Sequence, residues 1–252
     1  MGNDGRGAGA GSGSAAPPPV RHVPPFNVGD QFRPAILKTL HEQEIRQLVN
    51  RAMAKDSQLR IAPFWLEPRV MGDGHRPTPA EEKAALAQRQ AMEKETRRIL
   101  DELAHTDAGF RLLNDLVNAS PRWVVVGNSN GPRNNTDIDG PLENAYAKPD
   151  GTPGSGGSAI VSINPTLTTY AVGGEKELPW MTERVQFGFY HELVHAWHIQ
   201  HGTLARGDHG NVPNAEWQAV GLGPYAGQPI TENKIREQMG KELRPDVDRR
   251  QY

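Results

Sequence analysis

Apolar residues along much of this chain recur at spacings of three and four, which is the period of an amphipathic helix. Residues 31–55 form the first such stretch, with apolar positions at Ile36, Leu37, Leu40, Ile45, Leu48, Val49, Ala52 and Met53. Farther along, Thr78 and Glu81 form a capping box with proline at the first helical position, which predicts a second helix ending near Ala104. A third helix is predicted over residues 108–118.

Two short runs rich in β-branched residues follow these helices and predict buried strands at residues 123–126 and 158–163. Residues 127–157 are rich in Asn, Gly, Pro and Asp, which predicts one long polar loop between the strands. The acidic residues of this loop are expected to be solvated charges: Asp137, Asp139 and Glu143. Because the two strands come shortly before another helix, we expect an edge strand beside a cleft, where a peptide could bind by strand addition.

That helix is expected to begin after Thr182, its predicted N-cap, and to stop at Gly202. It contains His191-Glu192-Leu193-Val194-His195, an H-E-x-x-H motif. Residues i and i+4 share one helix face, so His191 and His195 can direct two imidazole nitrogens at one zinc ion. Glu192 can then reach a zinc-bound water, which predicts hydrolysis of peptide bonds with Glu192 as the general base.

Three candidate residues lie after the motif, and any one of them could be the third zinc ligand. His201 has the metzincin spacing, but that pattern needs glycine at position 198, where this chain has His198. On a continuing helix His201 would lie about three turns along the axis from His191 and could not reach the metal. His209 lies in a predicted flexible loop. Glu216, at a probable helix start, gives the gluzincin arrangement and is the preferred third ligand.

Composition limits the chemistry and the partners. The chain has 252 residues, a formal net charge of −2 and no cysteine. Near-zero charge gives no reason to expect nucleic acid as a partner, and no apolar run is long enough for a membrane span. Without cysteine, a metal must be held by His, Asp or Glu. Residues 1–29 are mainly Gly, Ala, Ser and Pro, and they predict a disordered leader that could serve as a secretion signal.

The segment from His191 to His198 resembles the zinc helix of clostridial neurotoxin light chains. It is more closely similar to the bacterial type III secreted effector zinc endopeptidases. In both groups the third ligand opens an E-x-x-x-x-G segment, which an E-N-x-x-R segment follows; this chain has Glu216 to Gly221 and then Glu232 to Arg236. The light chains also carry R-x-x-Y, which Arg249 and Tyr252 match.

The resemblance, which covers about residues 180–252, implies Glu216 as the third zinc ligand and Arg249 with Tyr252 as donors to the oxyanion. It implies an α+β fold, a mainly helical zincin-like (gluzincin) metallopeptidase with a small sheet beside the active-site helix. Residues 30–252 are then expected to form a single domain, with the catalytic core at about 120–252. The expected protein is monomeric, is delivered by a type III system into the host cell cytoplasm, and cleaves a host protein, by analogy a MAP kinase.

Two features of the sequence keep alternatives open. Both related groups have an acidic residue just before the third ligand that orients a zinc histidine, whereas this chain has Ala215. The alternative function is therefore an effector without catalysis that acts by binding a host protein. Glu232 could replace Glu216 as the ligand, although Asn233 and Arg236 favour a structural helix start with an internal ion pair.

Overall fold

The structure is a computed structural model that describes residues 33–54, 56–61, 78–128, 131–171 and 175–247. The chain divides into two compact units, Met1–Thr39 and Leu40–Tyr252. The leader predicted at residues 1–29 lies outside the described residues. Helix α1 (Arg33–Ala52) begins in the first unit and ends in the second, and the features below belong to the second.

The three helices predicted ahead of residues 123–126 are confirmed as α1, α2 (Pro79–Ala104) and α3 (Asp107–Asn118). The capping box at the start of α2 is present, because the Thr78 hydroxyl accepts a hydrogen bond from the Glu81 amide and the Glu81 carboxylate accepts one from the Thr78 amide. These helices contribute a continuous apolar layer to the core: Ile45, Leu48, Ile99, Leu100, Leu103, Leu112, Leu113 and Leu116. Leu86, nearer the start of α2, is 53 % exposed, so only the last turns of α2 join the core.

The sheet has the strand order β1-β2-β4-β3. Strands β1 (Leu59–Ile61), β2 (Val124–Asn128) and β4 (Ser158–Ile163) are parallel, and β3 (Asn135–Asp139) pairs with β4 in the antiparallel direction. The two predicted strands are confirmed as β2 and β4, but both lie inside the sheet, whose described edge strands are β1 and β3.

The prediction of one long polar loop at residues 127–157 is wrong, because this segment contains β3 and the short helix α4 (Leu142–Ala145). Along β3 exposure alternates: Thr136 and Ile138 are partly buried, whereas Asn135, Asp137 and Asp139 are exposed. Asn and Asp are rare in strands, so the local sequence signals a loop; pairing with β4 supplies the hydrogen bonds that make it a strand.

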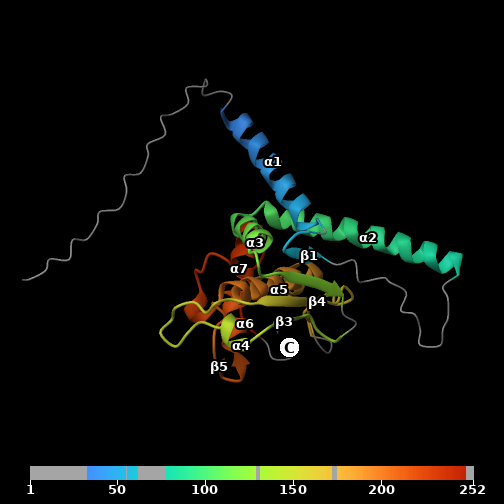
Figure 1. The fold of residues 1–252 in the computed structure, drawn as a ribbon. Coiled ribbons are helices and arrows are strands. Elements are labelled where there is room, and N and C mark those ends of the chain that lie inside the picture. Colours follow the sequence, from blue (N-terminus) through green and yellow to red (C-terminus); the bar gives the residue numbers. More distant parts are fainter. Residues whose placement is uncertain (1–32, 55, 62–77, 129–130, 172–174, 248–252) are drawn as a thin grey trace, which may run out of the picture. The chain divides into compact units, whose positions relative to one another are not determined.

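Helix α5 (Arg184–His201) carries the H-E-x-x-H motif and lies against the sheet (Figure 1). Its predicted N-cap is wrong: the Thr182 hydroxyl donates to the Pro179 carbonyl, and Glu183 occupies the cap position with φ at 59°. Its predicted end is confirmed, because Gly202 adopts φ of 66°. Nearby, the Gly154 amide donates to the Gly202 carbonyl at 2.7 Å, so the chain entering β4 runs directly beside the end of α5.

After α5 come a small hairpin, β5 (Asp208–His209) with β6 (Val212–Pro213), and helices α6 (Asn214–Val220) and α7 (Glu232–Gln238). Both helices pack against α5. The described fold is therefore α+β, mainly helical, with a small sheet beside the motif helix, as expected. None of the described helices has the length and apolar composition that a bilayer span requires.

Candidate metal centre

Three side chains from two helices meet at one point beside the sheet. The His191 and His195 Nε2 atoms are 3.0 Å apart. Glu216 places Oε2 3.0 Å from the His191 Nε2 atom and Oε1 3.3 Å from the His195 Nε2 atom. Both histidines are buried and Glu216 is partly buried, so the group could hold a metal ion.

The spacing of these donor atoms fits zinc. Nitrogen and carboxylate ligands lie about 2.0–2.2 Å from zinc at tetrahedral angles, which places neighbouring ligand atoms about 3.3 Å apart. The observed separations of 3.0–3.3 Å are close to this value. Three protein ligands also leave one tetrahedral position open, as in catalytic zinc sites.

Glu216 reaches the histidines because α6 is anchored to the chain that leaves α5. The buried Gln218 amide donates to the Thr203 carbonyl and accepts from the Ala205 amide, both at 2.9 Å. At the other end, Gly221 closes α6 with φ of 85°. The helix therefore keeps a fixed position against α5, and Glu216 in its first turn points at the histidines.

The other nitrogen of His191 is held by Glu232. The Nδ1 atom of His191 donates to Glu232 Oε2 at 3.0 Å, which leaves Nε2 facing His195 and Glu216. Glu232 thus lies on the side of His191 away from the ligand atoms and orients the ring, as an outer partner of a metal ligand does. Glu232 thus provides the acidic partner for a zinc histidine that the related groups place at the position of Ala215.

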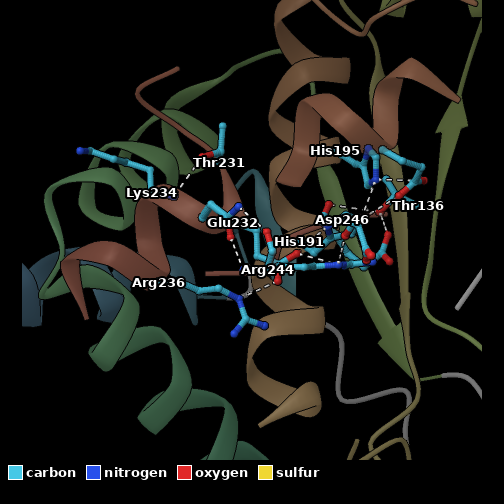
Figure 2. Close-up of polar contacts among 12 residues, drawn as sticks. Thr136, His191, His195, Thr231, Glu232, Lys234, Arg236, Arg244 and Asp246 are labelled. Atoms are coloured by element: carbon cyan, nitrogen blue, oxygen red, sulfur yellow. Dashed lines mark hydrogen bonds and ion pairs between the residues drawn. The ribbon is translucent and has the colours of Figure 1, made fainter. Parts of the chain in front are cut away.

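Glu232 is itself part of a buried ion network, which Figure 2 shows beside His191. Its carboxylate accepts from Arg236 Nε at 2.8 Å and from Arg244 Nη1 at 3.3 Å. The ion pair expected between Glu232 and Arg236 is confirmed. Arg236 also lies over the Phe187 ring, with its Cζ atom 3.8 Å from the ring centroid. The network fixes α7 against α5 and holds the carboxylate that orients His191.

The two carboxylates set the protonation of His191. Burial lowers the pKa of His191, but hydrogen bonds to Glu216 and Glu232 outweigh burial and raise it to about 10. Burial raises the pKa of Glu216, yet the His195 and His191 charges bring it well below its usual value. In the metal-free protein His191 is therefore cationic at neutral pH, and a metal ion must displace its proton.

Glu192 follows His191 in α5, and its side chain faces strand β3. Its carboxylate Oε2 accepts from the Thr136 hydroxyl at 2.6 Å. Burial raises the pKa of Glu192 and outweighs the opposing effect of the two histidines and Thr136. Thr136 could not be selected from the sequence pattern, because it lies in the segment that was expected to be a loop.

The remaining sequence candidates lie elsewhere or outside the described residues. His201 stacks on Trp197 with ring centroids 4.3 Å apart, and its Nδ1 atom lies 2.8 Å from the Trp197 carbonyl oxygen. His209 is exposed and lies against the Trp217 ring. Neither belongs to the three-residue group. Arg249 and Tyr252 lie outside the described residues.

Comparison with known protein families agrees with a peptidase site. Residues 81–246 match the family model Peptidase_M91, described as an effector protein. The match covers about two thirds of the chain and includes His191, Glu192, His195, Glu216 and Glu232. No curated protein matches the chain. The family name suggests protease activity. The chain belongs to the Peptidase_M91 family of effector proteins.

Proposed function

We propose that this protein is a zinc metalloendopeptidase that hydrolyses peptide bonds of a host protein. The observation that carries the proposal is the convergence of His191, His195 and Glu216 at zinc-ligand separations, with the carboxylate of Glu192 beside them. The two imidazole nitrogens and the small number of protein ligands favour zinc over magnesium or calcium, which prefer six or more oxygen ligands.

The roles of the side chains follow from their contacts. Zinc, when bound, would polarise the scissile carbonyl and lower the pKa of a water molecule at the open position. His191 and His195 would hold the zinc through their Nε2 atoms, after His191 has lost its Nε2 proton, and Glu232 holds the His191 ring through Nδ1. Glu192 takes the proton of the attacking water on its carboxylate and passes it to the departing amine. Burial raises the pKa of Glu192, which is the direction that a general base accepting a proton needs.

We propose that the substrate lies along β3. Among the described strands, β3 pairs only with β4, so its other backbone edge can accept an extended peptide. Thr136 of this strand contacts Glu192, which places the edge close to the general base. The expected strand addition is thus kept, but it is assigned to β3 and not to the two strands predicted from the sequence.

The family description supports an effector, and the resemblance of the motif region supports the remaining details. We propose delivery by a type III system into the host cytoplasm, with a MAP kinase as the substrate, and a monomeric protein. Arg249 and Tyr252 are proposed as oxyanion donors on the resemblance alone. Residues 30–252 are proposed as one domain with a catalytic core at about 120–252, because one apolar cluster extends from Ile45 to Ile235.

The decisive experiment is removal of the base without removal of the metal. We expect Glu192→Gln to abolish cleavage of an unfolded test protein and of a candidate host kinase, while the variant keeps one zinc per chain. Glu82→Gln, an exposed change on α2, is the matched control and should keep full activity. Chelation should abolish cleavage by the parent protein. Cleavage that survives in Glu192→Gln, or in the presence of chelator, would contradict the proposal.

A further inference from the structure

The Glu192 side chain has one hydrogen bond among the described residues, and its donor is Thr136. The Thr136 Oγ1 atom is 2.6 Å from Glu192 Oε2 and 3.1 Å from the Glu192 carbonyl oxygen. A hydroxyl has a single hydrogen, and distances of 2.5–2.7 Å are typical of a hydroxyl that donates to a carboxylate. The hydrogen therefore goes to Oε2, and the carboxylate is bound at one oxygen only.

Binding at one oxygen matters because a glutamate ends in a weakly restricted torsion. Rotation about χ3 is broad and roughly two-fold, so a carboxylate without a partner samples many orientations. The residue is 6 % exposed, so water cannot readily replace the Thr136 hydroxyl as a donor. With Oε2 held, Oε1 is the oxygen left to receive a proton.

Thr136 has a fixed position of its own. It lies on β3 opposite Val161 of the central strand β4. One turn before His191, a Cβ atom at Gly188 would lie only 2.5 Å from Asn134 Nδ2, so the chain entering β3 lies directly against α5. Asn134 in turn accepts a hydrogen bond from the Asn164 amide at 2.8 Å. The hydroxyl is thus supported by both the sheet and the motif helix.

We infer that Thr136 is a positioning residue that orients the general base Glu192 through its hydroxyl. The inference rests on the proposed peptidase function. Because β3 is also the strand on which the substrate is proposed to lie, one element sets the place of both the peptide and the base. Thr136 acts through Glu192, so its loss should lower the rate of the chemical step more than it weakens substrate binding.

The test compares two substitutions at Thr136. Thr136→Val removes the hydroxyl and keeps the branched shape, whereas Thr136→Ser keeps the hydroxyl. We expect Thr136→Val to lower kcat about 10- to 100-fold, the usual effect of losing an outer partner in a metal site, with KM changed less than about two-fold. Thr136→Ser should retain most of the kcat of the parent protein. Both variants should keep the zinc content of the parent.

A control and a second measurement separate positioning from general damage. Thr152→Val removes a comparable hydroxyl bond, to Asp150 Oδ1 at 2.7 Å in the exposed turn before β4, and should leave kcat unchanged. Crystal structures of the metal-free Thr136 variants should show the Glu192 carboxylate displaced in the valine variant and in place in the serine variant. Equal losses of kcat in both variants, an unchanged kcat in Thr136→Val, or an unmoved carboxylate would overturn the inference.

Failure of the inference can be distinguished from failure of the proposed function. If the parent protein cleaves in a chelator-sensitive way and Glu192→Gln does not, the function stands, and Thr136→Val then decides the role of Thr136. If the parent protein does not cleave, the proposed function fails, and the positioning role fails with it. The melting temperature of the valine variant is compared with that of the parent to check that it folds. If it unfolds, the serine variant must retain most of the parent's kcat, and a loss of about 10-fold or more there overturns the inference.

Discussion

Replacement of Glu232 by glutamine removes one negative charge from a site that holds three donors. The carboxylate accepts from His191 at 3.0 Å, from Arg236 at 2.8 Å and from Arg244 at 3.3 Å. Glutamine has nearly the same volume, so the change leaves packing intact and alters charge and hydrogen bonding. Both guanidinium side chains are 1 % exposed and cannot regain hydration where they lie.

The expected size follows from the uncompensated charge. Loss of one partner of a buried ion pair costs about 3–5 kcal/mol. For a protein of this size each kcal/mol lowers the melting temperature by about 2–4 °C, so Glu232→Gln should lower it by roughly 6–20 °C in the metal-free state. Zinc affinity should fall about 10- to 100-fold, because the hydrogen bond that orients the His191 ring loses its charged acceptor.

Two assays measure these effects: urea unfolding in the presence of a chelator, and competition for zinc with a chelator of known affinity. Adding Arg236→Met to Glu232→Gln removes one stranded cation and places an apolar chain on the Phe187 ring. The double variant should regain part of the lost stability but none of the lost zinc affinity. If Glu232→Gln changes the free energy of unfolding by less than about 0.5 kcal/mol, the range of an ordinary surface change, the reasoning about the buried network is refuted.

Two further outcomes are expected. Folding raises the pKa of His191 from 6.5 to about 10, so its protonation stabilises the metal-free protein fully below pH 6.5, and this stability is lost as the pH rises to about 10. Urea unfolding with chelator across this range should show the decline, and zinc-saturated protein should lack the contribution. Gly202→Ala should lower the unfolding free energy by more than about 1–2 kcal/mol, since φ is positive and a Cβ would lie 2.4 Å from the Gly154 carbonyl oxygen; calorimetry showing an unchanged melting temperature would contradict this.

The part of the site that lies within one helix could be predicted from the sequence. The spacing of His191 and His195 fixes their common face once α5 is helical, whatever surrounds it. The position of Glu216 could not be predicted in the same way, because its approach to the two histidines depends on α6 being anchored to the chain that leaves α5. Its selection from the sequence rested on a helix start and on a resemblance.

The role of Glu232 could not be derived from the sequence, where it remained an alternative ligand. A carboxylate on the Nε2 side of His191 can bind the same metal ion as the histidine, whereas a carboxylate on the Nδ1 side can only accept a hydrogen bond from the ring. For Glu232 this is settled by two arginines that pull its carboxylate to the Nδ1 side of His191. Arg244 lies 12 residues beyond Glu232, outside the helix whose pattern the sequence shows.

Strand β3 shows a different limit of sequence reasoning. Three of its five residues are Asn or Asp, which favour loops, and the two that face α5 are too few to display a period. The strand forms because β4 offers an unpaired backbone edge. Thr136 becomes a candidate only when that pairing brings its hydroxyl to Glu192. Likewise, Thr182 is a residue type that is common at N-caps, but its hydroxyl donates a hydrogen bond to the Pro179 carbonyl.

The placement of β3 at the edge has a consequence for local stability. A strand with one neighbour keeps half of its backbone groups outside the ladder, and such segments open at a lower free energy than the centre of a sheet. An added peptide would give β3 a second neighbour and suppress this opening. Substrate binding and the local unfolding of β3 are then linked equilibria. Strand β3, which carries the Thr136 hydroxyl that contacts Glu192, therefore becomes most ordered when a peptide is bound.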